Sequence, residues 1–308
     1  MKKAFSKSVS WLLSVVMIFG IAFMPASSSS NMGNLSVNAT DNYFMFSDSK
    51  TFFPNNKRFY FSGYYGSSMV WYELSENSSI LTLGGKGYLI KGMLSKFQYC
   101  GIKKVIISGD IGDIGENAFE GFKNLESVQF TGTTESIPDY TFSECTSLSF
   151  VDCGNVKNIG KKAFGNCSSL VSVVNTNNVT DIGAWAFKDC TSLEEVYFPS
   201  VITIDSLAFA NCSSLAKADI GSNVTSIGSS AFAGCTKLSS ITIPKSVTNM
   251  GSYVFNISND FKNYKYDEND YIVINGYSGS TAEAYAKRYN ITFHYWDKEA
   301  TDLIINYK

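Results

Sequence analysis

The chain has 308 residues, enough for one large domain or two ordinary ones. Its 25 lysine and arginine residues nearly balance its 27 aspartate and glutamate residues, which argues against nucleic-acid binding because that function needs a concentrated basic face. Aromatic residues make up 15% of the chain, which excludes an intrinsically disordered protein.

The N-terminus has the pattern of an export signal. The first residues include three lysines and are followed by an apolar run from about Trp11 to Met24. Small residues come directly after this run. This order predicts a secretory signal peptide over residues 1–30, with an alternative end at residue 39. The apolar run is shorter than the roughly 20 residues of a membrane span, and no other segment is apolar for longer. We therefore expect a secreted or cell-surface protein with no membrane insertion after signal removal and no anchor recognisable in the sequence.

Residues 40–90 are dense in aromatic side chains and predict a β-rich N-terminal cap. A repeat array exposes its apolar core at both ends unless other segments cover it, so we expect this cap to cover the N-terminal end of the core.

Residues 91–255 are dominated by an internal repeat. A segment of the form IGxxAFxxCxSLxxVxI recurs in six clear copies, and a degenerate coil around Phe97 precedes them. The spacing of the anchoring phenylalanines is always 22 or 23 residues; they are Phe119, Phe142, Phe164, Phe187, Phe209, Phe232 and Phe255. A fixed period of this length is typical of a solenoid, in which each repeat buries its apolar face against its neighbours.

Each repeat predicts one coil with a strand and a turn. In L-x-x-V-x-I, the side chains of Leu238, Ile241 and Ile243 should point inward, and the last two alternate as strand residues do. The A-F-x-x-C segment predicts a short helical turn with Phe and Cys on one face. Asn175, which falls on an inward strand position, indicates an irregular coil.

Residues 256–308 predict a C-terminal cap made of a helix and a strand. Ser280 and Glu283 have the spacing of a capping box at the start of a helix that should run to Tyr289. Asn290 should end the helix, and residues 291–293 should add a last strand.

The repeat pattern resembles the bacterial surface-antigen family of leucine-rich repeats, known as BspA-like or Treponema-type repeats. The similarity covers about residues 90–295. Upstream of it, residues 70–74 and 80–87 resemble the short β-rich cap that often precedes such repeats, and residues 276–286 resemble the closing segment that is usual in the family. The resemblance implies a leucine-rich repeat solenoid with parallel β-strands on one face and short helical turns on the other. It also implies extracellular adhesion or ligand binding, with no catalysis.

The seven cysteines predict buried thiols and neither a metal site nor disulfides. Cys153 takes an inward strand position, and the other six follow a repeat phenylalanine by three residues: Cys100, Cys145, Cys167, Cys190, Cys212 and Cys235. Free cysteine behaves as a small apolar residue in cores. Zinc needs ligands that converge as a tetrahedron, whereas these cysteines should form a row. The distance between neighbouring coils would permit a disulfide, but parallel Cβ directions argue against one.

The remaining candidates for chemistry are weak. His294 is the only histidine, and its position in the terminal strand favours a structural role over a nucleophilic dyad or triad. The acid pairs Glu73 with Glu76 and Glu194 with Glu195 have the residue types of a glycosidase but a spacing usual for solvated surfaces. The acidic segment 267–270 lacks the spaced ligands and glycine of a calcium loop. We therefore predict no catalytic residue, no metal and no cofactor.

A binding function should reside on the strand residues that face away from the core. Aromatic side chains beside acids are typical of recognition patches, although scattered surface aromatics are also common. The candidate ligand-binding residues on this outward face are Phe150, Asp152, Glu195, Tyr197, Lys217 and Asp219.

The sequence thus favours a monomeric, exported protein that binds an extracellular protein or polysaccharide. Two alternatives remain open at this point. One is a structural spacer of the cell envelope without a ligand, which suits the many small outward residues. The other is a glycan-acting enzyme with its chemistry in the aromatic N-terminal region, residues 31–95.

Overall fold

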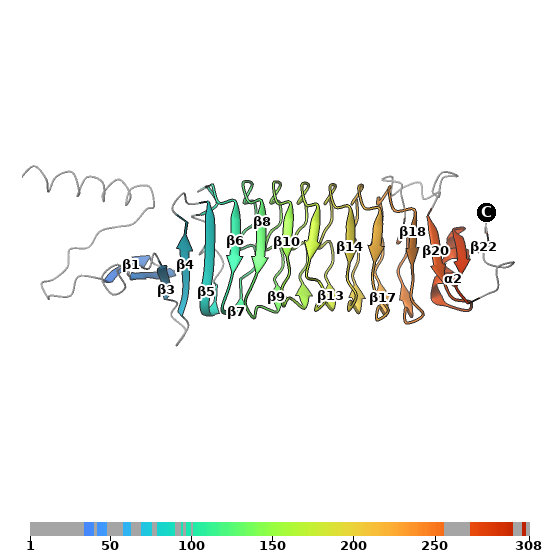
Figure 1. Ribbon diagram of the computed structural model, residues 1–308, viewed down its shortest axis with the longest axis horizontal. Helices are drawn as coiled ribbons and strands as arrows, with labels where there is room; N and C mark the ends of the chain where they lie inside the picture. Colours follow the sequence, from blue (N-terminus) through green and yellow to red (C-terminus); the bar gives the residue numbers. More distant parts are fainter. Residues whose placement is uncertain are drawn as a thin grey trace, which may run out of the picture.

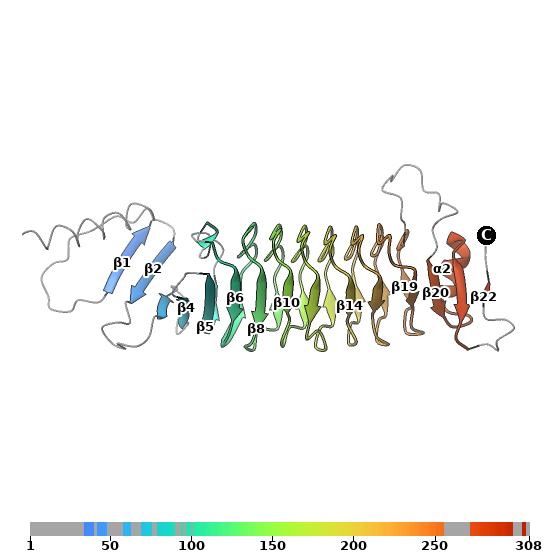
Figure 2. The same ribbon diagram turned by 45° about the horizontal axis from the view of Figure 1, so that its top comes forward.

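A computed structural model of the chain describes residues 34–39, 42–47, 58–62, 69–75, 79–89, 94, 97–99, 101–255, 272–297 and 304–305. The predicted signal peptide, Cys100, Glu76 and the acidic segment 267–270 lie outside these residues. The described residues form a nearly straight stack of coils, with N-terminal strands at one end and helix α2 (Thr281–Tyr289) near the other (Figure 1). The stack is straight in the turned view as well (Figure 2). The predicted repeat solenoid is confirmed.

The N-terminal end of the stack is built from β-strands. An antiparallel pair is formed by β1 (Asn34–Ala39) and β2 (Asn42–Ser47). A second antiparallel group follows, made of β3 (Arg58–Ser62), β4 (Met69–Leu74) and β5 (Ile80–Tyr88). Because β5 then pairs in parallel with β6 (Lys104–Ile107), the antiparallel strands lead directly into the repeats. Both strands expected in the N-terminal cap are confirmed.

Each coil contributes strands to two faces of the stack. The long-strand face, as we call it, consists of β6, β8 (Ser127–Phe130), β10 (Phe150–Asp152), β12 (Ser172–Val174), β14 (Glu195–Tyr197), β16 (Lys217–Asp219) and β18 (Ser240–Thr242). The short-strand face consists of β9 (Ser136–Ile137), β11 (Asn158–Ile159), β13 (Asp181–Ile182), β15 (Thr203–Ile204), β17 (Ser226–Ile227) and β19 (Asn249–Met250). A further strand, β7 (Asp110–Asp113), pairs with β5. The second strand in each coil is a feature that the sequence analysis did not predict.

The A-F-x-x-C segments form the third side of each coil. Their backbone hydrogen bonds alternate: Phe164 N donates to Ala186 O of the next coil at 2.8 Å, whereas Cys167 N donates to Phe164 O within the coil at 3.2 Å. The bonds within a coil span three residues, as in a helical turn. Residues in the left-handed conformation, such as Lys162 and Asn166 with φ of 52° and 62°, interrupt the helical geometry of these segments. The predicted helical turn is therefore present only as isolated turns.

The repeat phenylalanines form one stacked column through the core. Consecutive rings from Phe119 to Phe255 have centroids 5.1 to 5.9 Å apart and lie within 19° of parallel. All seven side chains are buried. The inward strand residues Leu238, Ile241 and Ile243 are buried too, as predicted. The period of the sequence therefore places identical apolar groups in register along the whole array.

The irregular coil contains Asn175, but the predicted inward position of this residue is wrong. Asn175 is exposed and adopts a left-handed φ of 56°. Its side-chain amide donates to Asp152 Oδ1 at 2.8 Å. The next residue, Thr176, is the buried one instead.

The C-terminal end is closed by the helix and strands that follow the repeats. Helix α2 begins after Ser280, whose side chain accepts a hydrogen bond from Glu283 N, and ends at Asn290 in the left-handed conformation. Two parallel strands, β20 (Val273–Gly276) and β21 (Thr292–Tyr295), continue the long-strand face beyond β18, and β22 (Ile304–Ile305) pairs with β21. From α2, the ring of Tyr285 packs edge-on against Phe255 at 6.0 Å, and its hydroxyl accepts from Val254 N. The helix thereby covers the last ring of the phenylalanine column, and the predicted helix and strand are confirmed.

Candidate binding surface

The outward side chains of the long-strand face form two columns. Parallel register places Phe150 beside Ser127 and Ser172 in the first column, and Asp152 beside Gln129 and Val174 in the second. The same register on the next pair of strands places Glu195 beside Lys217 and Tyr197 beside Asp219. The predicted candidates therefore do lie on the strand face that points away from the core.

The six candidate residues fall into two separate groups. Glu195, Tyr197, Lys217 and Asp219 are exposed neighbours on β14 and β16. Phe150 and Asp152 lie on β10, are half-buried and are separated from β14 by β12.

Asp152 has a structural task. Its Oδ1 atom accepts a hydrogen bond from Gly154 N at 3.1 Å and another from the Asn175 side chain at 2.8 Å. The carboxylate therefore stabilises the turn after β10 and connects it to the next coil. These two hydrogen bonds use part of its capacity to accept hydrogen bonds, so less of it remains for a ligand.

The long-strand face is divided, whereas the short-strand face is continuous. All six strands from β9 to β19 form one parallel ladder. On the long-strand face, the part of the chain that the structure describes has no ladder between β12 and β14 or between β16 and β18. The phenylalanine column and the short-strand ladder hold the coils together at these two breaks.

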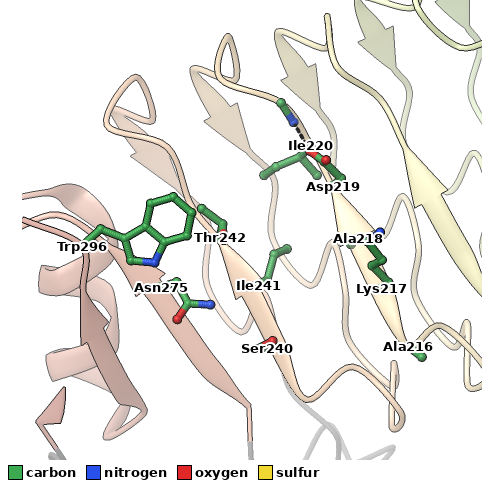
Figure 3. Close-up of a pocket in the computed structure, with 11 residues that line it drawn as sticks. Ala216, Lys217, Ala218, Asp219, Ile220, Ser240, Ile241, Thr242, Asn275 and Trp296 are labelled. Atoms are coloured by element: carbon green, nitrogen blue, oxygen red, sulfur yellow. Dashed lines mark hydrogen bonds between the residues drawn. The ribbon is translucent and has the colours of Figure 1, made fainter. Parts of the chain in front are cut away.

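A groove opens at the break between β16 and β18 (Figure 3). It has a volume of about 310 Å³ and is lined by Ala216 to Gly221, Ser240 to Thr242, Asn275 and Trp296. Its floor includes Ala218, which is only half-buried although it takes the inward position that valine or isoleucine fills in the neighbouring coils. At the other break, Val173 and Val196 fill the same position and are buried. The small side chain of Ala218 therefore contributes to the hollow.

The groove combines predicted residues with others that the sequence analysis missed. Lys217 and Asp219 were predicted, whereas Thr242, Asn275 and Trp296 were not. Asn275 lies beside Thr242 in the parallel register of β18 and β20. Trp296, which directly follows β21, belongs to the C-terminal cap and has no equivalent in the repeats. The unusual alanine at position 218 was the one signal in the repeat that could have indicated this place.

Internal hydrogen bonds fix two of the polar side chains of the groove. Asp219 Oδ1 accepts from Gly221 N at 3.0 Å, which is the dashed line in Figure 3. Asn275 Oδ1 lies 3.0 Å from His294 Nδ1, an arrangement in which the imidazole N–H donates. The second carboxylate oxygen of Asp219 and the side-chain NH₂ of Asn275 have no partner among the residues that the structure describes. Both groups are therefore oriented and still available for a ligand.

The cysteines form a row of buried thiols. In five successive coils, the Sγ atom lies 3.1 to 3.2 Å from the carbonyl oxygen of the phenylalanine one coil earlier, to which the thiol donates. Burial raises the pKa of Cys145 and of Cys153 to about 12, so both thiols are neutral at physiological pH. All six described cysteines are free of disulfides. Their arrangement indicates packing and hydrogen bonding between coils.

The described residues hold neither a cluster of metal-binding side chains nor a membrane-spanning helix. No cluster of three or more His, Cys, Asp or Glu side chains suitable for a metal ion occurs in the ranges that the structure covers. In those ranges, too, no helix combines the length and the apolar character that crossing a bilayer demands.

Comparisons with known proteins identify the repeat. Residues 94–215 and 157–280 match the family described as BspA type Leucine rich repeat region (6 copies). No curated protein matches the chain. A leucine rich cell surface protein from Faecalibacterium prausnitzii is similar in structure, with 28% identity, coverage of 63% of this chain and 52% of that chain, and a TM-score of 0.48. A leucine-rich repeat protein from Bacteroides ovatus shares 20% identity over 68% of this chain and 64% of that chain, with a TM-score of 0.43.

The chain thus spans about half the length of the Faecalibacterium prausnitzii protein and less than two thirds of the Bacteroides ovatus protein. The family match, in contrast, extends from residue 94 to residue 280, which is more than half of the 308 residues. The chain belongs to the BspA type leucine-rich repeat family.

Proposed function

We propose that the chain is an exported, non-catalytic repeat protein that binds an extracellular protein or glycan through its long-strand face. The observation that carries the proposal is the group of exposed side chains on β14 and β16, namely Glu195, Tyr197, Lys217 and Asp219. They combine an aromatic ring with charges of both signs, which is the composition of a recognition patch. Tyr197 is 54% exposed although its ring is large and apolar.

The scaffold behind this patch suits binding because it is rigid. The phenylalanine column and the short-strand ladder run unbroken behind the long-strand face. With a spacing of about 4.8 Å between strands, the seven strands from β6 to β18 extend over about 30 Å, which is enough for a protein partner or for several sugar units. A rigid surface loses little conformational entropy when it binds.

Several features support a role without catalysis. The thiols of Cys145 and Cys153 are buried and neutral, whereas a catalytic cysteine is exposed and ionised. His294 is paired with Asn275, and no described Ser or Cys side chain shares a hydrogen bond with it. Export, in turn, rests on the signal-like pattern of residues 1–30.

The proposal is tested by a binding assay with a face-specific variant. The purified protein is presented to immobilised extracellular matrix proteins and to a glycan array. We expect a ligand whose binding is lost when Phe150 and Tyr197 are both replaced by alanine. The matched control is Ile202→Ala, since Ile202 is also an exposed apolar side chain but directly precedes β15 on the short-strand face.

Binding that survives the double replacement, with the fold intact by circular dichroism, would refute this site. If the protein binds nothing in either assay, the spacer function gains support instead. The proposal also predicts a monomer with no affinity for nucleic acid.

A further inference from the structure

The groove between β16 and β18 is a preformed hollow in the long-strand face. Two features coincide there. Strands β16 and β18 are not joined by a β-ladder, and the small side chain of Ala218 leaves space at the bottom of the groove. Its volume of about 310 Å³ lies at the lower end of the range of small-molecule sites, about 300 to 1,000 Å³. The groove thus has the size for a compact ligand unit such as a sugar ring, and it is much too small for a folded protein.

One end of the groove is formed by an exposed tryptophan. Trp296 is 56% exposed and lies next to Thr242 and Asn275 (Figure 3). Its position is fixed, because its backbone N–H donates to Gly276 O at 2.8 Å and its ring contacts Tyr277 edge-on at 6.5 Å. A large apolar ring that is both exposed and fixed offers a flat platform, on which the C–H faces of a sugar ring can pack.

The polar groups of the groove are mixed donors and acceptors. Asp219 offers a carboxylate oxygen, the NH₂ group of Asn275 offers two N–H donors, and Thr242 offers a hydroxyl that can do both. Because each sugar hydroxyl can both donate and accept a hydrogen bond, sugars can bind to the acceptors and to the donors of the groove. The single ammonium of Lys217 and the single carboxylate of Asp219 balance in charge, which favours an uncharged ligand over a phosphate or a sulfated chain.

A peptide fits the groove less well. An extended peptide binds by adding a strand to a free sheet edge. The edge of β16 is not free in this sense, since β18 lies alongside it (Figure 3).

We propose that this groove binds a neutral glycan, with one sugar ring packed on Trp296 and its hydroxyls hydrogen-bonded to Asp219 and Asn275. The inference rests on the proposed binding function and specifies the ligand class and the site. Tyr197, next to Asp219 in the register of β14 and β16, extends the same surface for a second sugar unit.

The test uses an array of neutral oligosaccharides, followed by titration calorimetry with the best-bound oligosaccharide. We expect binding to the full chain and a loss of affinity of at least tenfold in Trp296→Ala and in Asn275→Ala. The variant Trp296→Phe keeps an aromatic platform and should retain most of the affinity. Ile202→Ala serves as the control, and circular dichroism verifies that each variant is folded.

Each outcome decides the proposal. Selective loss in Trp296→Ala and Asn275→Ala, with retention in Trp296→Phe, supports it. It is overturned if no neutral oligosaccharide binds, or if binding survives Trp296→Ala. A protein ligand that needs Phe150 and Tyr197 but is insensitive to Trp296→Ala and to enzymatic deglycosylation would leave the proposed function standing and remove the glycan site.

Discussion

Replacing Phe187 by alanine should destabilise the array more than any single change on its surface. The ring of Phe187 is fully buried and stacks between Phe164 at 5.3 Å and Phe209 at 5.2 Å, with Phe198 at 6.1 Å. Truncation removes contacts to all three rings and leaves a cavity in the middle of the column. Phe→Ala changes in cores cost about 3 to 5 kcal/mol. Because whole domains are stable by only about 5 to 15 kcal/mol, this loss is a large fraction of the total.

The loss is measured by urea denaturation, followed by circular dichroism and by the exposure of cysteine thiols. Tyr197→Ala is the matched control, since it removes an aromatic ring from the same coil but at an exposed position, and it should change the free energy of unfolding by less than about 0.5 kcal/mol. A repeat array is stabilised by contacts between neighbouring coils, so Phe187→Ala should also separate the transition into two steps. Equal midpoints for the two variants would refute the stacked column as the main source of stability.

Three further predictions concern the thiols and the cap. Burial raises the pKa of Cys145 from 9.0 to about 12, so the folded state holds this proton more tightly than the unfolded state. The contribution of this thiol to stability should therefore be complete below pH 9 and be lost between pH 9 and 12, and Cys145→Ala should make the fall in stability over this range shallower in denaturation experiments. At pH 8 a thiol reagent should react with the six described cysteines only after unfolding, and fewer than six free thiols in the unfolded, unreduced protein would contradict their free state. Ser280→Ala removes the acceptor for Glu283 N and should lower the free energy of unfolding by about 1 kcal/mol, whereas Ser280→Asp, which keeps an acceptor, should not.

The fold could be predicted from the sequence because the apolar positions repeat. Phe164, Phe187 and Phe209 stand 22 or 23 residues apart, and stacking is the arrangement that buries all of them at once. The helix from Thr281 to Tyr289 was predictable for a different reason, since Ser280 before it and Asn290 after it are local capping signals. The two-residue strands of the short-strand face were missed because so short a stretch has no detectable alternation.

The candidate site was predicted only in part. Lys217 and Asp219 were found because outward strand positions follow from the repeat. Asn275 and Trp296 belong to the C-terminal cap. Their position near β16 depends on how the cap packs against the repeats, and the repeat pattern does not predict it. Asp152 shows the opposite error: its outward position is correct, but its hydrogen bonds to Gly154 and Asn175 could not be read from the pattern.

The groove itself leads to a prediction in which stability and binding should change in opposite directions. Valine or isoleucine fills the position of Ala218 in the neighbouring coils, as at Val196 and Ile241. Ala218→Val adds two carbons that have space in the groove, so it should raise the free energy of unfolding by about 1 kcal/mol.

The same two carbons would raise the floor beneath Asp219 and Asn275, and they should therefore weaken the binding of a neutral oligosaccharide at least tenfold. Ala184→Val, at a half-buried alanine that does not line the groove, controls for the added volume alone. A gain in stability together with lost affinity would mean that the coil gives up part of its packing to keep the groove open. If Ala218→Val binds the oligosaccharide with unchanged affinity, the groove is not the binding site. Ala218 is then a departure from the repeat without a role in binding.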